Sequence, residues 1–257
     1  MEVQKILKKD SFIPDSWGKL KAFTNARIAL GRTGVTTPLK EVLDFKLCHA
    51  HARDAVFSLL NIDELVTSLQ QFQLPVIIVN SKAKDRIVYL QRPDHGRKPD
   101  DESRDKLKNE KENGFNVVIV IADGLSATAI NKHAVPVLER LISLLKRSGL
   151  SIAPLIVAQQ ARVAIADEIG SILNSTLSLI LIGERPGLSS PDSLGAYITY
   201  QPLPGLTDES RNCVSNIRPE GLTYDAAAEK IAKLINASLQ LKLSGILLKD
   251  DLQQLHQ

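Results

Sequence analysis

The sequence has little cysteine and no long apolar run, and each of these scarcities counts against a class of protein. Only two of its 257 residues are cysteines, Cys48 and Cys213, and they have no C-x-x-C spacing. A disulfide framework and a cysteine-based zinc site are therefore disfavoured, and a reducing compartment is expected. No apolar run approaches the roughly 20 residues that a membrane-spanning helix needs. The first ten residues also lack the hydrophobic core of a secretory signal. We therefore expect an intracellular protein with no membrane partner.

The charges are nearly balanced. Thirty-two lysines and arginines stand against 29 acidic residues, for a formal net charge of +3 at pH 7, and the small excess is spread along the chain. Proteins that bind nucleic acid usually concentrate positive charge on one face. We therefore expect no nucleic-acid partner. A hydrophobic content of 44% with 24% charged residues is typical of a globular domain with one main core.

Three parts are predicted along the chain. Residues 1–25 contain lysines, proline and glycine without a sustained period, and we interpret them as an N-terminal arm that orders against another surface. Residues 26–60 form a helical N-terminal section. Its helix begins at Thr37-Pro38, an N-cap residue followed by proline at the first helical position, and runs to about Phe57. Residues 61–257 form the main domain.

The main domain alternates short β-branched apolar runs with helical stretches. This rhythm is typical of a parallel sheet with helical crossovers, and strands buried on both faces appear as continuous apolar runs. The fold class predicted is α/β, with a Rossmann-like, mostly parallel sheet, flanking helices and the helical N-terminal section. The predicted strands are Val117–Ala122, Ile152–Ala158, Leu177–Ile182 and Ala196–Tyr200, and the predicted helices are 126–147, 161–173, 224–243 and one from about Asp101. Upstream, Leu74–Val79 and Ile87–Leu90 are predicted to form a hairpin or an edge pair.

Polar, loop-like sequence follows each of the three central strands. The segments are Asp123-Gly124-Leu125-Ser126, Gln159-Gln160-Ala161-Arg162 and Gly183-Glu184-Arg185-Pro186-Gly187. Parallel strands end at one shared edge, where open α/β sheets bind their ligands, so these segments predict a site for a polar ligand. In the alternative interpretation, Asp123 and Ser126 only cap a helix and Glu184-Arg185 is a surface ion pair.

Common catalytic and cofactor motifs are missing. Gly31-Arg32-Thr33-Gly34 matches neither the dinucleotide-binding nor the P-loop pattern, and it precedes the predicted sheet. Ser189-Ser190 lacks the strand-turn-helix setting of a nucleophile elbow, and the five histidines form no cluster. We therefore predict no catalytic residue and no metal ligand in this chain.

Several long motifs resemble the small (light) subunit of ethanolamine ammonia-lyase over about residues 25–250. They are Ala26–Arg32, Cys48–Val56, Ile121–Ser126, Gly183–Gly195, Arg211–Gly221 and Leu243–Asp250. The resemblance implies a subunit of an adenosylcobalamin-dependent radical lyase that converts ethanolamine to acetaldehyde and ammonia. It also implies a large-subunit partner, a TIM barrel that holds the substrate and the catalytic side chains, within a higher hetero-oligomer in the bacterial cytoplasm. The small subunit would cover and orient part of the cobalamin at their interface.

The resemblance places cofactor contacts on Val163, Glu184 and Cys213, all of which match the family in residue type. Without it, Val163 would be interpreted as helix core, Cys213 as a small buried hydrophobic residue and Glu184 as an ion-pair partner. Arg162 and Arg185 are added here because they can reach the same ligand and because cobalamin carries amides and a phosphate.

No residue of the chain is expected to ligate cobalt. Asp94-His95-Gly96 does not fit the D-x-H-x-x-G spacing of another cobalamin-binding family, so the cofactor would keep its own benzimidazole. The segment before Ala26 is short, whereas enteric relatives carry a longer leader linked to packaging in a bacterial microcompartment, which leaves encapsulation open. Two other functions stay open: a freestanding nucleotide-dependent α/β enzyme, and an assembly subunit without ligand contact.

Overall fold

The computed structural model describes residues 12–24, 26–110 and 114–248. The chain divides into two compact units, one made of residues 1–54 with 187–190 and the other of residues 55–186 with 191–257. The predicted boundaries at residues 25 and 60 stay predictions. Much of the predicted arm and the end of the last family motif lie outside the described residues.

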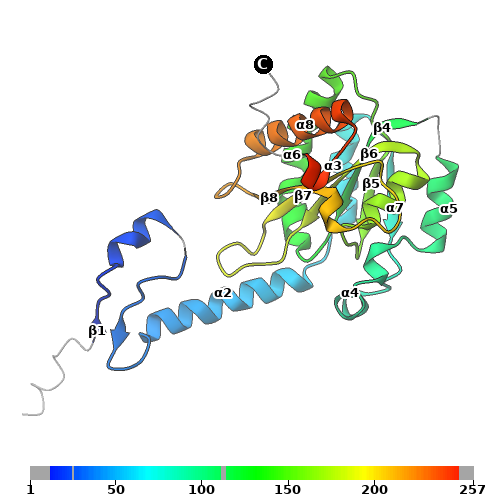
Figure 1. The fold of residues 1–257 in the computed structure, drawn as a ribbon. Helices are drawn as coiled ribbons and strands as arrows, with labels where there is room; N and C mark the ends of the chain where they lie inside the picture. The colour runs from blue at the N-terminus through cyan, green and yellow to red at the C-terminus, as the bar shows by residue number, and fades with distance from the viewer. Residues whose placement is uncertain (1–11, 25, 111–113, 249–257) are drawn as a thin grey trace, which may run out of the picture. The chain divides into compact units, whose positions relative to one another are not determined.

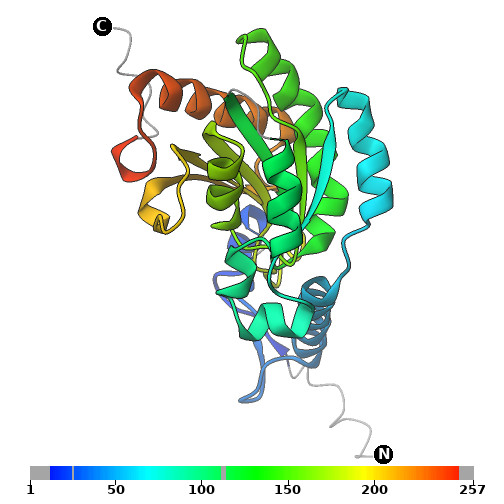
Figure 2. The same ribbon diagram turned by 90° about the vertical axis from the view of Figure 1, so that its right-hand side faces the viewer.

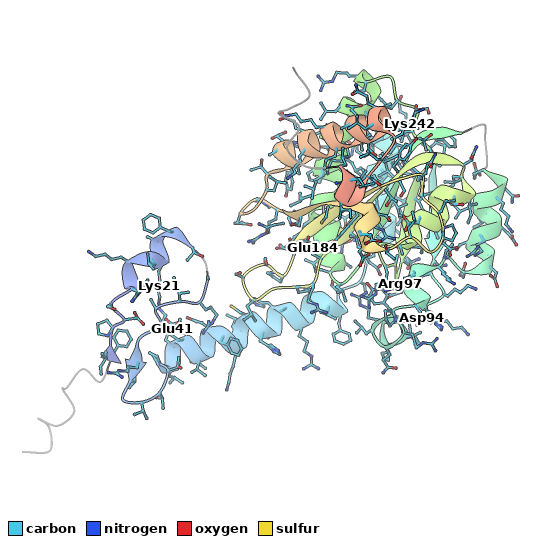
Figure 3. All side chains as sticks on the ribbon, in the orientation of Figure 1. Lys21, Glu41, Asp94, Arg97, Glu184 and Lys242 are labelled. Carbon is cyan, nitrogen blue, oxygen red and sulfur yellow. The ribbon has the colours of Figure 1, made fainter. Side chains whose placement is uncertain are left out.

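The first unit contains a small two-stranded sheet and most of a long helix. β1 (Phe12–Ile13) pairs antiparallel with β2 (Arg32–Thr33), and the 3₁₀ helix η1 (Gly18–Phe23) lies between them in sequence. Helix α2 (Leu39–Phe57) confirms the helix predicted after Thr37-Pro38. Lys21 Nζ lies 3.5 Å from Glu41 Oε1, which ties η1 to α2 (Figure 3).

The second unit is built on a six-stranded sheet within the described part of the chain. Its order is β3-β5-β4-β6-β7-β8 (Figures 1 and 2). The first four strands are parallel, β7 runs antiparallel to β6, and β8 runs antiparallel to β7. The strands are β3 (Val76–Asn80), β4 (Phe115–Ala122), β5 (Leu155–Gln159), β6 (Ser175–Gly183), β7 (Leu194–Tyr200) and β8 (Arg211–Ile217). The predicted α/β, mostly parallel sheet is confirmed.

Helices cover both faces of this sheet. Helices α3 (Ile62–Leu69), α6 (Ala127–Arg147) and α8 (Tyr224–Leu241) share one apolar cluster with one face, and α5 (Asp101–Asn109) and α7 (Ile165–Ile172) share a second cluster with the other. In β4, alternate residues from Val117 to Ala122 enter the two clusters, and all are fully buried. Burial on both faces explains the continuous apolar runs. No helix of the described residues is long and apolar enough to cross a membrane.

The predicted pairing of Leu74–Val79 with Ile87–Leu90 is wrong. The second segment is helix α4 (Arg86–Gln91), and the edge strand β3 pairs in parallel with β5 instead. The Asp85 side chain accepts a hydrogen bond of 2.8 Å from the Val88 backbone N–H, which caps the start of the helix. A local cap thus outweighs the strand preference of the β-branched residues. Strand β8 and helix α3 were not predicted.

Candidate functional site

The carboxylate of Asp123 joins the loops that follow β4 and β5. Its Oδ1 accepts hydrogen bonds from the backbone N–H groups of Gly124 (2.9 Å) and Ala161 (3.0 Å), and its Oδ2 accepts one from Gln160 (2.8 Å). Burial raises the pKa of the Asp123 carboxyl, and the three N–H donors and the nearby Arg86 oppose that rise. The side chain therefore links two strand ends, which the alternative of a simple helix cap did not include.

The loops after β4 and β6 touch through two glycines. Gly124 has a left-handed φ of +58°, and a Cβ atom there would lie 2.2 Å from the carbonyl oxygen of Gly183. A Cβ atom on Gly183 would lie 2.0 Å from the Ser126 carbonyl oxygen. No larger residue fits either position unless the backbone moves. The predicted sharing of one edge by the three central strand ends is thus observed in atomic contact.

A cavity of about 430 Å³ opens at this edge. Four of the five predicted site residues line it: Arg162, Val163, Glu184 and Arg185. The described lining does not include Cys213, but Cys213 pairs in register with Tyr197, which does line the cavity. The other lining residues are Tyr89, Gly124, Leu125, Ile182 and Gly183. Residues from five separate stretches of sequence therefore meet around one cavity.

Glu184 directly follows β6 (Figure 3). Hydrogen bonds from two other segments hold its carboxylate. Its Oε2 accepts a short hydrogen bond from Ser193 Oγ and a second, of 3.2 Å, from the Asn216 N–H. A Cβ atom on Gly195 would lie 3.0 Å from Glu184 Oε1, so glycine leaves room for the carboxylate. Among the described residues no ion pair joins Glu184 to Arg185, which contradicts the interpretation of this dipeptide as a surface ion pair.

Arg162 is held against the buried ring of Tyr89. Its Cζ lies 4.1 Å from the ring centroid, and its Nη2 donates a hydrogen bond of 3.1 Å to the Tyr89 carbonyl oxygen. The guanidinium of Arg86 lies 4.6 Å from the same centroid. Burial raises the pKa of Tyr89 to about 12, so the ring is a neutral phenol that donates to the Ala161 carbonyl oxygen. Because Arg86 also lies 3.8 Å from the Asp123 carboxylate, Arg162 is the one of the two that gives this side of the cavity a positive charge held in place.

Cys213 and Val163 differ from the interpretations made without the resemblance. Cys213 is exposed rather than buried, and Val163 is half-buried and precedes α7 rather than lying in its core. The surrounding protein raises the pKa of the Cys213 thiol, mainly by desolvation, and desolvation also raises the pKa of its hydrogen-bond partner Tyr197. Both groups are therefore neutral near pH 7, and the thiol offers small volume rather than a reactive thiolate.

Sequence reasoning missed Tyr89 and Tyr197. Tyr89 lies in the segment that was predicted as a strand, so its place behind Arg162 could not be derived. Tyr197 lies in a predicted strand, and knowing that β8 follows would have placed it beside Cys213. Over the described ranges no group of three or more histidine, cysteine or acidic side chains is arranged to hold a metal ion.

Comparison with known proteins gives a consistent result. The family model described as "Ethanolamine ammonia-lyase light chain (EutC)" matches residues 14–249. The chain is 50% identical over 232 residues to the ethanolamine ammonia-lyase small subunit of Rhodopseudomonas palustris (strain BisA53), covering 90% of this chain and 89% of that protein. It is 47% identical over 240 residues to the small subunit of Xanthomonas campestris pv. campestris, covering 92% and 88%. With the small subunit of Pseudomonas aeruginosa the identity is 46% over 250 residues, covering 94% and 92%.

Proposed function

The chain belongs to the ethanolamine ammonia-lyase light chain family, and on that premise we propose that it is the small subunit of an adenosylcobalamin-dependent lyase that converts ethanolamine to acetaldehyde and ammonia. In this proposal the chain covers and orients the cobalamin at the interface with a large subunit, which supplies the catalytic side chains. The two subunits form a higher hetero-oligomer in the bacterial cytoplasm. Packaging of that complex in a microcompartment is the alternative location, and cell fractionation distinguishes the two.

The observation that carries the proposal is the meeting of Arg162, Val163, Glu184 and Arg185 around one cavity, with Cys213 adjacent. A cavity of about 430 Å³ is at the small end of the roughly 300–1,000 Å³ typical of sites for drug-sized ligands. Cobalamin is larger than such ligands, so this cavity fits one edge of it and leaves the rest of its surface for another protein to cover. That fit favours a shared, interfacial cofactor site.

Exposed apolar residues of the first unit support a protein partner. Leu39, Leu43 and Leu47 follow one another at four-residue spacing on α2, and they are 72%, 54% and 55% exposed. Trp17 and Phe23 are exposed as well. Helices in proteins gain most of their stability by burying an apolar face, and Ala55 is the one buried residue of this 19-residue helix. We assign the large subunit as the partner that covers these side chains.

Adenosylcobalamin, when bound, supplies the radical chemistry of the lyase, and the chain supplies binding and orientation. The carboxylate of Glu184 has about four acceptor positions, and Ser193 and Asn216 donate to one of its two oxygens. It can therefore also accept N–H groups from the cofactor's amides. The proposal assigns no cobalt ligand to this chain, and the residues that line the cavity would hold outer groups of the cofactor.

Reconstitution from purified subunits tests the proposal. The chain alone should not release ammonia from ethanolamine, because it has no predicted base, metal or nucleophile for the reaction. The two subunits together with adenosylcobalamin should turn over, and the large subunit alone serves as the control. Activity of the chain alone would favour a freestanding enzyme. A complex whose cobalamin affinity equals that of the large subunit alone would favour an assembly subunit without ligand contact.

A further inference from the structure

The cavity has more positive charge than its own acidic side chain balances. Six other arginines of the described residues form an ion pair with a carboxylate, among them Arg104 with Glu168 and Arg211 with Asp167. Arg162 and Arg185 both line the cavity, and over the described residues neither has an ion-pair partner. The one carboxylate in the lining, Glu184, is already stabilised by two hydrogen bonds. An anionic group on a ligand would balance the remaining positive charge of the two arginines.

Arg162 is also held in place before any ligand binds. Its stacking on the Tyr89 ring and the hydrogen bond from its side chain to the Tyr89 carbonyl oxygen fix the plane of the guanidinium. Its Nε is buried and has no hydrogen-bond partner. A Cβ atom on Gly96 would lie only 2.8 Å from Arg162 Cγ, so the neighbouring backbone is shaped around this side chain. The outer nitrogen Nη1 has no hydrogen-bond partner among the described residues and is not buried, so it is the donor that a ligand acceptor in the cavity can reach.

We propose that Arg162, assisted by Arg185, binds the phosphodiester in the nucleotide tail of the cofactor, so that the chain selects corrinoids with a complete tail. The proposal rests on the proposed function and specifies which part of the cofactor the cavity holds. The side chains around the corrin ring of cobalamin are neutral amides, and the phosphodiester is its anionic group. Guanidinium groups match the oxygens of a phosphate with parallel hydrogen bonds, and the charge on both partners strengthens them. Glu184 would serve amide N–H groups nearby rather than the anion.

The test compares two corrinoids on the complex of both subunits. Aquacobalamin carries the whole tail, whereas diaquacobinamide has the same corrin ring without phosphate, ribose or base. Equilibrium dialysis with absorbance detection gives the Kd of each corrinoid for the wild-type complex and for the variants Arg162→Gln, Arg162→Lys and Arg185→Gln. Arg147→Gln, at the far end of α6, is the matched control, since its Nε donates only to the Ser143 carbonyl oxygen of its own helix.

Arg162→Gln should raise the Kd of aquacobalamin by about 10- to 100-fold, because it removes a hydrogen bond between charged groups. The Kd of diaquacobinamide should stay within about two-fold, as should both values for Arg147→Gln. Arg162→Lys should keep part of the preference for aquacobalamin over diaquacobinamide that Arg162→Gln loses, because lysine keeps the positive charge. Arg185→Gln should change selectivity in the same direction but less, since Arg185 is exposed.

If Arg162→Gln raises the Kd of both corrinoids equally, or changes neither Kd, the assignment of the phosphodiester to Arg162 is overturned. The proposed function would still stand. Failure of the wild-type complex to bind either corrinoid would instead contradict the proposed function. If Arg162→Gln does not assemble with the large subunit, Arg162→Lys and Arg185→Gln decide the matter. Unchanged selectivity in both of them refutes the proposal.

Discussion

Replacement of Glu184 by alanine is the sharpest test of how the two subunits divide their work. A hydrogen bond to a charged group contributes about 1.5–3 kcal/mol, which corresponds to a rise of roughly 10- to 100-fold in the Kd of the cofactor. Because the carboxylate would contact the bound cofactor equally in the ground state and the transition state, kcat at saturating cofactor should fall much less. The assay is a cofactor titration of the reconstituted complex at saturating ethanolamine.

Two further variants separate charge from geometry at this position. Ser193 Oγ and the Asn216 N–H both donate to the same oxygen of Glu184, so Glu184→Gln can keep both hydrogen bonds while it loses the charge. Ser193→Ala keeps the charge and loses one hydrogen bond, and it should raise the Kd by about 2- to 10-fold. The cofactor Kd of both variants should therefore lie between that of wild type and that of Glu184→Ala. If Glu184→Ala leaves the Kd intact but abolishes kcat, Glu184 is catalytic and the assignment of catalysis to the large subunit is wrong.

Three other predictions concern the thiol, the core and the pH dependence. Cys213→Ser should raise the cofactor Kd less than Cys213→Trp, because the site needs small volume, and equal effects in the same titration would count against that. Asp167 and Arg211 form an ion pair in which both side chains are 2% exposed. Asp167→Asn should therefore lower the free energy of unfolding in urea by about 3–5 kcal/mol, and the double variant Asp167→Leu/Arg211→Met by less. A double variant as unstable as the single one would contradict this. Burial lowers the pKa of His133 below its usual value of 6.5. As the pH falls, His133 is therefore protonated in the unfolded chain at a higher pH than in the folded chain. The free energy of unfolding should then decrease as the pH falls through about 6.5, and the decrease should be smaller in His133→Gln. An identical pH dependence in that variant would remove His133 as its source.

The edge that carries the site was predictable from the sequence because the reasoning needed only local patterns. Continuous apolar runs indicated strands buried on both faces, and parallel strands joined by helices must end at one edge. The polar segments after those strands were therefore expected to meet. The structure brings Arg162, Val163, Glu184 and Arg185 to one cavity. The family, too, was predictable, since its long motifs are matched along most of the chain.

The errors came from positions where a local pattern fits two structures. Ile87 to Leu90 contains the β-branched residues typical of strands, but a hydrogen bond from Val88 to the Asp85 side chain starts a helix there. Because this segment was assigned to a strand, the contact of Tyr89 with Arg162 could not be predicted. Strand β8 begins among polar residues, and only its pairing with β7 makes it a strand. Sheet edges of this kind are decided by a neighbour rather than by their own residues.

The sequence by itself determined the central strands, the edge where they end, the family and the identity of the residues at that edge. Tertiary structure alone decided how those residues are held. Glu184 receives hydrogen bonds from Ser193 and from Asn216, 32 positions away, and Arg162 lies on the ring of Tyr89, 73 positions before it. Such contacts join segments that no local pattern relates, because they depend on the strand order that brings the segments together. The unpaired charge of the cavity is therefore a property of the folded chain, although each charged residue could be read from the sequence.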